Sequence, residues 1–316
     1  MSEITQNNTS TLLEVNGLKQ YFRLNRNFSV KAVDGVSFEI RKGETYGLVG
    51  ESGSGKSTIG RSIIRLYEPS DGTIHYKGRD ISGKMDRQTE QMLRTSMQMI
   101  FQDPMASLNP RMTVLDIIAK GLDVHKLYKS RDEREQKVLD ILERVGLSRQ
   151  FATRYPHQFS GGQRQRIGIA RALVMNPDLV IADEAISALD VSIQAQIVNL
   201  MKEISEERDL DYLFLAHDLS MVKYISDRIG VLHLGHMIET GTTEEIFERP
   251  LHPYTRSLIS AIPHPNPMVE KRRQSFGYHY ETSGLDYEAS DFNHVGGSHY
   301  VLGRADDLSQ WLKETE

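Results

Sequence analysis

The segment GESGSGKST, residues 50–58, restricts the fold of this chain more than any other feature of its sequence. It follows the apolar run TYGLVG and opens a second apolar run, KSTIGRSIIRLY, so we expect a buried strand, a glycine-rich turn and a helix. The spacing fits G-x-x-x-x-G-K-[ST], in which glycines let successive backbone N–H groups point at phosphate oxygens. A flexible glycine–serine turn is the alternative, and the position between two apolar elements argues against it.

The residue types in this segment indicate a nucleotide site with a magnesium ion. Lys56 would reach the β- and γ-phosphates, and the Ser57 hydroxyl would bind Mg²⁺. The other residues that we expect to line the nucleotide are Gly50, Glu51, Ser52, Gly53, Ser54, Gly55 and Thr58.

A second segment, DLVIADE at residues 178–184, is an apolar run that ends in two carboxylates. Asp183, at the end of the predicted strand, suits a Mg²⁺ ligand, and Glu184 stands where it could polarise an attacking water. An ordinary strand followed by an acidic helix cap is the alternative, and the phosphate-loop pattern upstream argues against it. The two segments together predict one site for a nucleotide phosphate and a metal ion.

Strand-like and helix-like runs alternate along most of the chain. VDGVSFEI alternates with period two, and DLVIAD, YLFLAH and RIGVLHL are further strand candidates separated by predicted helices. Such alternation predicts an α/β fold with a mainly parallel sheet covered by helices. Residues of about 105–175 are mostly helical in pattern, so we interpret them as an insertion into the α/β core.

Composition excludes several classes of protein. The 316 residues are 39% hydrophobic and 26% charged, and the net charge of −5 gives no electrostatic reason to expect a nucleic-acid or anionic-membrane partner. The chain has no cysteine, which excludes disulfides, thiolate metal sites and iron–sulfur clusters. It also has no apolar signal core and no run of about 18 apolar residues, so we expect a soluble, cytosolic protein.

The segment FSGGQRQRIGIARAL, residues 159–173, begins a predicted helix with two adjacent glycines. FSGGQ resembles the signature motif LSGGQ of ABC-transporter ATPase subunits, with phenylalanine in place of the leucine. Ser160 is a good N-cap, and Gly161 and Gly162 would let a phosphate held by another protomer approach bare backbone N–H groups, with Gln163 completing the motif. We interpret the arginines behind it, Arg164, Arg166 and Arg171, as a solvated helix face.

The resemblance to ABC-transporter ATPase subunits extends from residue 12 to about residue 267. It implies a P-loop NTPase core of the RecA-like type, an N-terminal antiparallel β subdomain and an inserted helical subdomain at about 105–175. The expected division is a polar tail at 1–11, a nucleotide-binding domain at 12–249 and a C-terminal extension at 250–316.

Further site residues follow from the same resemblance. Gln102 in MIFQDP matches the Q-loop glutamine, which touches Mg²⁺ or water, although it could simply be a polar residue that ends a strand. His217 in LFLAHD matches the switch histidine that contacts the γ-phosphate. Asp190 ends SALD, residues 187–190, which matches the D-loop, and its alternative role is a helix cap. Tyr21 in LKQYF best matches the aromatic residue that stacks on adenine, with Phe22 and Phe28 as rivals.

Three segments resemble the ATPase subunits of bacterial oligopeptide and dipeptide importers: FQDPMASLNPRMTV, ISALDVSIQAQI and RPLHPYTRSLISAIPHPNP. The match is closest to the F-type subunit, which pairs with a homologous D-type subunit. The resemblance implies ATP and Mg²⁺ as cofactors, Glu184 as the water-activating base, and two nucleotides sandwiched in a head-to-tail dimer. It also implies two membrane permease subunits, an extracellular peptide-binding protein that acts through them, and a peripheral location on the cytoplasmic face of the cell membrane.

Importers of nickel, heme precursors or glutathione use the same type of subunit and are the main alternatives. A DNA-repair ABC ATPase would need a long coiled coil between the phosphate loop and the signature, and a translation-associated one normally carries two cassettes. A P-loop kinase or GTPase would lack the signature, and no N-K-x-D guanine motif occurs.

Overall fold

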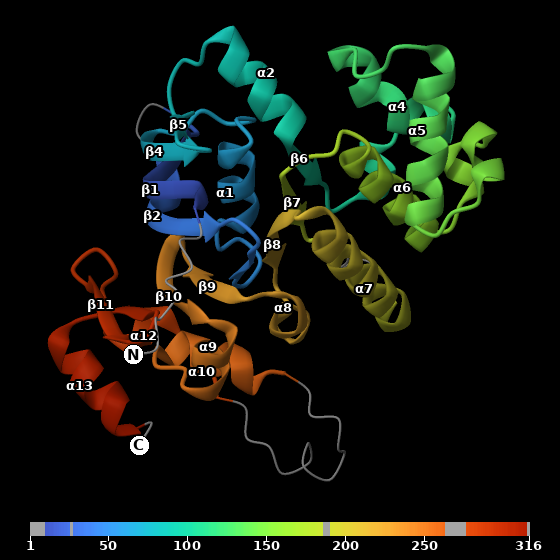
Figure 1. Ribbon diagram of the computed structural model, residues 1–316. Helices are drawn as coiled ribbons and strands as arrows, with labels where there is room; N and C mark the ends of the chain where they lie inside the picture. Colours follow the sequence, from blue (N-terminus) through green and yellow to red (C-terminus); the bar gives the residue numbers. More distant parts are fainter. Residues whose placement is uncertain (1–9, 26–27, 186–189, 263–275, 315–316) are drawn as a thin grey trace, which may run out of the picture.

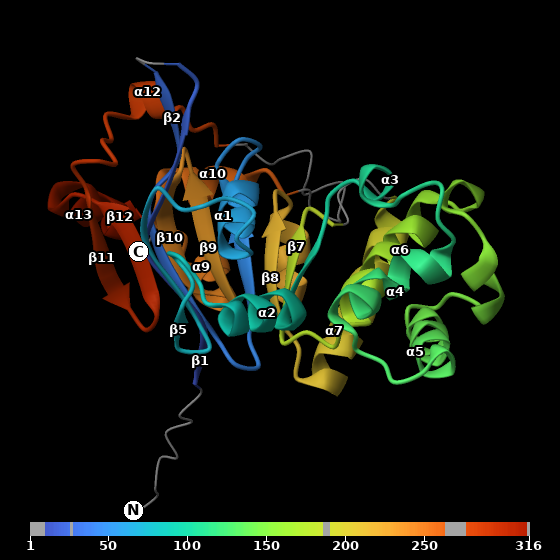
Figure 2. The ribbon, with the colours of Figure 1, turned by 90° about the horizontal axis from the view of Figure 1, so that it is seen from above.

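A computed structural model describes residues 10–25, 28–185, 190–262 and 276–314. These residues form two sheets, with helices on both faces of the larger one and a group of helices to one side (Figures 1 and 2). The larger sheet has the order β11-β12-β10-β9-β3-β8-β7-β6, and the smaller one the order β2-β1-β4-β5.

The smaller sheet is antiparallel and comes from the N-terminal part of the chain. Its long strands alternate in burial, as the period-two pattern predicts, and Val36 and Ile40 are fully buried on one face. Its strands are β1 (Thr11–Arg23), β2 (Ser29–Arg41), β4 (Asp71–Tyr76) and β5 (Arg79–Asp80).

The centre of the larger sheet is parallel, which confirms the expected α/β class. Strands β9, β3, β8, β7 and β6 pair in parallel, and β3, β7 and most of β8 are buried along their length. Their bounds are β3 (Thr45–Val49), β6 (Met97–Ile100), β7 (Leu179–Asp183), β8 (Asp211–Ala216) and β9 (Arg228–His233).

Helix α1 (Lys56–Ile63) lies between the two sheets (Figure 1). Ile59 and Ile63 pack with β1 residues such as Leu18 and with Leu215 of β8 in one apolar core. The apolar pattern continues to Tyr67, but the helix ends earlier, and Arg65 has a left-handed backbone with φ of 64°. The phosphate-loop helix is therefore shorter than its sequence pattern indicates.

The helices at residues of about 105–175 form a group beside the β6 edge of the sheet, with their own apolar core (Figure 2). Ser130 caps α5, and Val138, Ile141 and Leu142, at i, i+3 and i+4, form its buried face. Helix α2 (Arg87–Ser96) precedes β6. The members of the group are α3 (Pro104–Ser107), α4 (Val114–His125), α5 (Arg131–Arg144), two 3₁₀ segments (Arg149–Thr153 and Pro156–Gln158) and α6 (Gly161–Leu173).

The C-terminal part continues the larger sheet. Strand β10 (His236–Thr242) pairs antiparallel with β9 and with β12 (His299–Gly303), and β12 pairs with β11 (Asp291–Gly296). Strands from both sides of residue 250 therefore belong to one sheet. The division of the chain into domains at residue 250 stays a prediction. The remaining helices are α7 (Val191–Arg208), α8 (Leu219–Ile225), α9 (Thr243–Glu248), α10 (Pro253–Ser260), α12 (Tyr280–Ser283) and α13 (Ala305–Glu314).

Candidate nucleotide-binding site

The phosphate loop lies between the end of β3 and the start of α1. Gly55 precedes the helix with φ of 108°, and a Cβ atom there would lie 2.4 Å from the Ala32 carbonyl oxygen, so only glycine fits. Within the described part of the chain, several backbone N–H groups of the loop meet no hydrogen-bond acceptor: those of Gly53, Gly55, Lys56, Ser57 and Thr58. Such unpaired donors at a helix N-terminus fit a phosphate group.

Lys56 is held inside the loop and is only 3% exposed. Its ammonium group donates to the carbonyl oxygens of Gly50 at 2.7 Å and Glu51 at 2.8 Å, and to the Ser54 hydroxyl at 3.3 Å. Burial lowers the pKa of Lys56, while the neighbouring carboxylates act in the opposite direction. Lys56 therefore lies within the loop that would surround an anionic ligand.

Of the three residues predicted to touch Mg²⁺, Ser57 and Asp183 lie in contact, whereas Gln102 donates its amide to Glu184 and its contact with the metal stays a prediction. The Ser57 hydroxyl donates to Asp183 Oδ1 at 2.6 Å, and Asp183 is fully buried at the end of β7. Its other oxygen, Oδ2, has no hydrogen bond within the described residues, although Arg61 Nη2 lies 3.5 Å away. Two hard oxygen donors beside a phosphate site fit Mg²⁺, which takes few protein ligands.

Arg61 is a site residue that the sequence analysis did not single out. It lies one helical turn after Ser57 on α1, and that i, i+4 spacing was a signal that it faces the same site.

Glu184 meets two residues from neighbouring strands at this edge of the sheet. Gln102, just after β6, donates its amide to Glu184 Oε2 at 2.6 Å, and His217 Nδ1, just after β8, lies 3.8 Å from Oε1. The backbone of Glu184 has φ of 45°, a strained conformation that is frequent at functional sites. Because β6, β7 and β8 are parallel neighbours, their carboxyl ends bring Gln102, Glu184 and His217 together beside Asp183.

The signature segment forms the start of α6. Ser160 and Gln163 make a capping box: the Gln163 N–H donates to the Ser160 hydroxyl at 3.3 Å, and the Ser160 N–H donates to Gln163 Oε1 at 3.0 Å. Gly161 is exposed. Gly162 is buried, and a Cβ atom there would lie 2.8 Å from Ile193 Cγ2 of α7, so packing alone requires this glycine.

The interpretation of the signature-helix arginines as a solvated face is wrong. All three donate to backbone carbonyls of neighbouring segments: Arg164 to Pro156 at 3.0 Å, Arg166 to Val145 at 2.6 Å, and Arg171 to Ser107. Burial also lowers the pKa of Arg171. These hydrogen bonds tie α6 to the surrounding helical segments.

Helix α6 lies in the helical group, away from α1 and the phosphate loop (Figures 1 and 2). No interaction among the described residues joins Ser160 to residues 50–58. Asp190 is exposed directly before α7 and makes no side-chain cap bond; the other SALD residues, 187–189, lie outside the described ranges.

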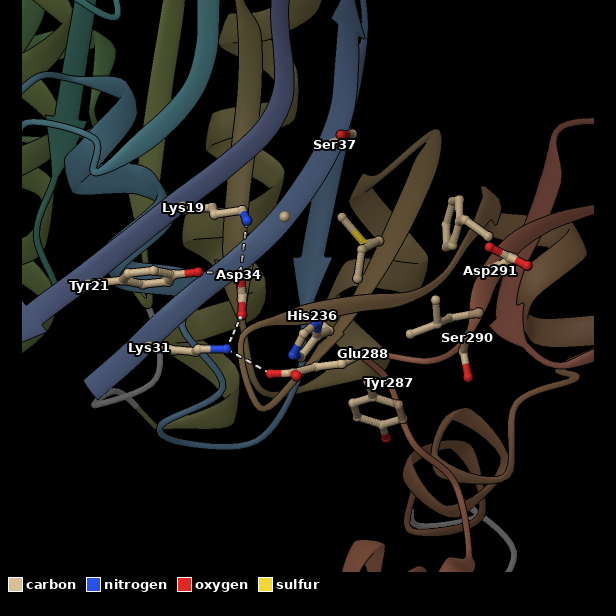
Figure 3. A pocket seen from close by; sticks show the side chains of 14 residues that line it. Lys19, Tyr21, Lys31, Asp34, Ser37, His236, Tyr287, Glu288, Ser290 and Asp291 are labelled. Carbon is tan, nitrogen blue, oxygen red and sulfur yellow. Dashed lines mark hydrogen bonds and ion pairs between the residues drawn. The ribbon is translucent and has the colours of Figure 1, made fainter. Parts of the chain in front are cut away.

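Tyr21 lines a different cavity, of about 510 Å³, between the smaller sheet and the C-terminal part (Figure 3). Its hydroxyl donates to Asp34 at 2.6 Å, and Lys31 Nζ lies 6.0 Å from its ring centroid. Phe22 packs edge-on against Tyr67 with centroids 5.2 Å apart, and Phe28 is largely exposed. No hydrogen bond or ring contact among the described residues joins Tyr21 to residues 50–58, and its adenine contact stays a prediction beside its two rivals.

Comparison with protein families gives two matches along the chain. Residues 33–187 match the ABC transporter family, and residues 238–282 match the oligopeptide/dipeptide transporter C-terminal region. Among solved structures, the dimeric ATP-binding cassette MJ0796 bound to ADP and Pi is 28% identical with a TM-score of 0.67, over 73% of this chain and 99% of that one. The cbiO1 protein of Clostridium perfringens is also 28% identical, with a TM-score of 0.66 over 75% and 90% of the two chains.

Characterised relatives cover nearly the whole chain. The oligopeptide transport ATP-binding protein OppF of Bacillus subtilis (strain 168) is 59% identical over 93% of this chain and 96% of its own length. The dipeptide transport ATP-binding protein DppF of Lactococcus lactis is 51% identical over 96% and 97%. Within the described ranges, no helix has the length and apolar character that a membrane span requires. The chain belongs to the ATP-binding proteins of ABC transporters, in the group that carries the oligopeptide/dipeptide transporter C-terminal region.

Proposed function

We propose that this protein is the ATP-hydrolysing subunit of an importer for oligopeptides or dipeptides. The observation that carries the proposal is the meeting of Gln102, Asp183, Glu184 and His217 beside a phosphate loop with unpaired N–H groups. The names of relatives that are 51–59% identical over almost the whole chain support peptides as the transported class.

The roles of the residues follow from their contacts. The loop N–H groups and Lys56 bind the β- and γ-phosphates, and Ser57 with Asp183 would hold Mg²⁺. When bound, the metal neutralises charge on the phosphate oxygens. Glu184 accepts a proton from the attacking water, while Gln102 fixes its carboxylate and His217 contacts the γ-phosphate.

The position of α6 favours a site shared by two protomers. Helix α6 lies away from α1 of the same chain (Figure 1), and its first turn carries the cap Ser160 and the exposed Gly161, which leaves a partner's phosphate loop as the one that it would contact. We propose a homologous D-type subunit as that partner, in a head-to-tail dimer with two nucleotides. On this proposal residues 12–249 bind the nucleotide, and the helical part at about 105–175 contacts two permeases at the cytoplasmic face of the membrane.

The transported molecule is tested on the assembled transporter. The subunit is reconstituted with its permeases, partner ATPase and binding protein in vesicles, and ATP-dependent uptake of labelled di- to pentapeptides is measured. Uptake of peptides that is lost with Glu184→Gln supports the proposal. Uptake of nickel, a heme precursor or glutathione with no uptake of peptides would assign the same subunit type to another cargo. Hydrolysis that needs no permease would favour a non-transport ABC ATPase.

A further inference from the structure

Tyr254 connects the C-terminal part of the chain to the phosphate loop. Its hydroxyl oxygen accepts the backbone N–H of Glu51 at 2.9 Å. Glu51 is the second residue of the loop, so this hydrogen bond fixes the backbone just after the end of β3. The tyrosine is only 2% exposed, which limits competition from water for this bond.

The backbone that carries Tyr254 is fixed by buried polar groups. Glu239 of β10 is fully buried and accepts the N–H groups of Leu251 at 2.7 Å and His252 at 3.1 Å. Its Oε1 also lies 2.7 Å from His299 Nε2 of β12. His252 in turn caps α10, because its Nδ1 accepts the Tyr254 N–H at 3.1 Å. These buried hydrogen bonds therefore fix the backbone of Tyr254 within the C-terminal part.

The ring of Tyr254 is also held from the side. It packs on His233, at the end of β9, with ring centroids 4.1 Å apart, and His233 Nδ1 lies 2.8 Å from the Tyr287 hydroxyl. The turn after β9 touches the loop itself, since Gly235 donates its N–H to the Ser54 carbonyl at 2.9 Å. Both hydrogen bonds attach the loop to this side of the molecule, and Tyr254 supplies the one at its beginning.

The hydrogen bond between Glu51 and Tyr254 uses a different N–H group from those that we propose bind the phosphates. Glu51 uses its N–H on Tyr254, whereas the N–H groups from Gly53 to Thr58, apart from Ser54, meet no acceptor among the described residues. Tyr254 therefore supports the loop without occupying the donors that face a phosphate. A loop freed at its beginning would populate other conformations, and the apparent affinity falls with the fraction that can bind.

We infer that Tyr254 is a positioning residue of the nucleotide site: its hydroxyl holds the phosphate loop in the conformation that binds a nucleoside triphosphate. Nucleotide affinity then depends on the C-terminal part of the chain. The inference rests on the proposed role of residues 50–58 in nucleotide binding.

The first test compares two tyrosine variants of the full-length chain. Tyr254→Phe removes the acceptor of the Glu51 N–H and keeps the ring. Tyr278→Phe is the matched control, because its hydroxyl bonds to Tyr287 within the same cluster. We expect Tyr254→Phe to raise the dissociation constant of MgATP about three- to tenfold, and Tyr278→Phe to change it less than about twofold. In the assembled transporter, KM for ATP should rise while kcat stays close to the wild-type value.

Equal MgATP affinity of Tyr254→Phe and wild type would overturn the inference. Lys56→Ala separates this outcome from a failure of the proposed function. If Lys56→Ala loses nucleotide binding and Tyr254→Phe does not, only the positioning role fails. If neither variant affects binding, residues 50–58 are not the nucleotide site.

A second test needs no variant. Amide hydrogen exchange of the wild-type chain without nucleotide should show Glu51 protected and Gly53 unprotected, since only the former N–H has an acceptor. Exchange of Glu51 as fast as that of Gly53 would show that the bond is absent in solution and would overturn the inference, even if Tyr254→Phe folds poorly.

Discussion

The side-chain amide of Gln102 donates a hydrogen bond of 2.6 Å to the carboxylate of Glu184. Gln102 follows β6 and Glu184 follows β7, and these strands are parallel neighbours. Beyond Gln102 the chain enters the helical group, so this bond joins the proposed catalytic base to the segment that we propose contacts the permeases.

The first prediction concerns the proposed base. Glu184→Gln keeps the shape of the side chain and can keep the contact with Gln102, but it cannot accept a proton from water. We expect MgATP affinity within about twofold of wild type and steady-state phosphate release about 10²- to 10³-fold lower in the assembled transporter. Glu206→Gln, on the exposed face of α7, is the control and should keep full turnover. Rapid turnover by Glu184→Gln would remove this residue from the mechanism.

The sequence predicted those parts of the site that depend on near neighbours. The strand–loop–helix at residues 45–63, the carboxylates at the end of β7 and the Ser160 cap are all set by spacings of a few residues. Parallel strands then bring Gln102, Glu184 and His217 to one edge, because their order in the sheet follows from the fold class.

The contacts that the sequence did not predict join residues far apart in the chain. Tyr254 and Glu51 are 203 positions apart, and HPYT by itself indicates only a loop followed by a short helix. Gly162 packs against Ile193 of another helix, and Arg166 donates a hydrogen bond to the Val145 carbonyl. Neither contact produces a periodic pattern in the sequence. Such pairings depend on how the elements pack, which a pattern within one element does not contain.

The second prediction concerns Lys56. Its ammonium group is buried and donates to the Gly50 and Glu51 carbonyls and the Ser54 hydroxyl, so a phosphate oxygen would replace one of these acceptors. Lys56→Ala removes charge-assisted hydrogen bonds worth about 1.5–3 kcal/mol, and MgATP should bind about 10- to 100-fold more weakly. Isothermal titration of the full-length chain measures this change, with Lys202→Ala, an exposed lysine of α7, as the control. Unchanged affinity of Lys56→Ala would argue against a phosphate site in this loop.

The third prediction tests the shared site. Gly161→Glu puts a negative charge at the exposed tip of α6, where it favours the helix dipole but repels a partner's phosphate. We expect unchanged or higher thermal stability, normal MgATP binding by the isolated chain, and loss of ATP-dependent association and hydrolysis. Arg87→Glu, at the exposed first residue of α2, controls for the added charge. Normal hydrolysis by Gly161→Glu in the assembled transporter would show that α6 does not face a nucleotide.

The fourth prediction is a pH dependence of stability that comes from two buried histidines beside Tyr254. Burial lowers the pKa of His252 to about 3 and that of His233 to about 4, whereas an unfolded histidine titrates near 6.5. Between these values the unfolded chain binds protons that the folded chain does not. The free energy of unfolding should therefore fall as the pH is lowered below about 6.5, by about 1.4 kcal/mol per pH unit for each histidine.

The variant His252→Asn removes one of these two titrating groups, so it measures the contribution of His252 to the pH dependence. Asparagine can accept the Tyr254 N–H in place of the imidazole Nδ1, so the cap of α10 is kept while the titrating group is removed. Urea unfolding of wild type and variant at pH 7, 6 and 5 should give a pH slope that is smaller in the variant by about one proton. His157→Asn, at an exposed position before α6, should leave the slope as it is. Parallel slopes for wild type and His252→Asn would mean that His252 does not stay neutral in the folded protein, because a buried neutral imidazole must cost stability in acid.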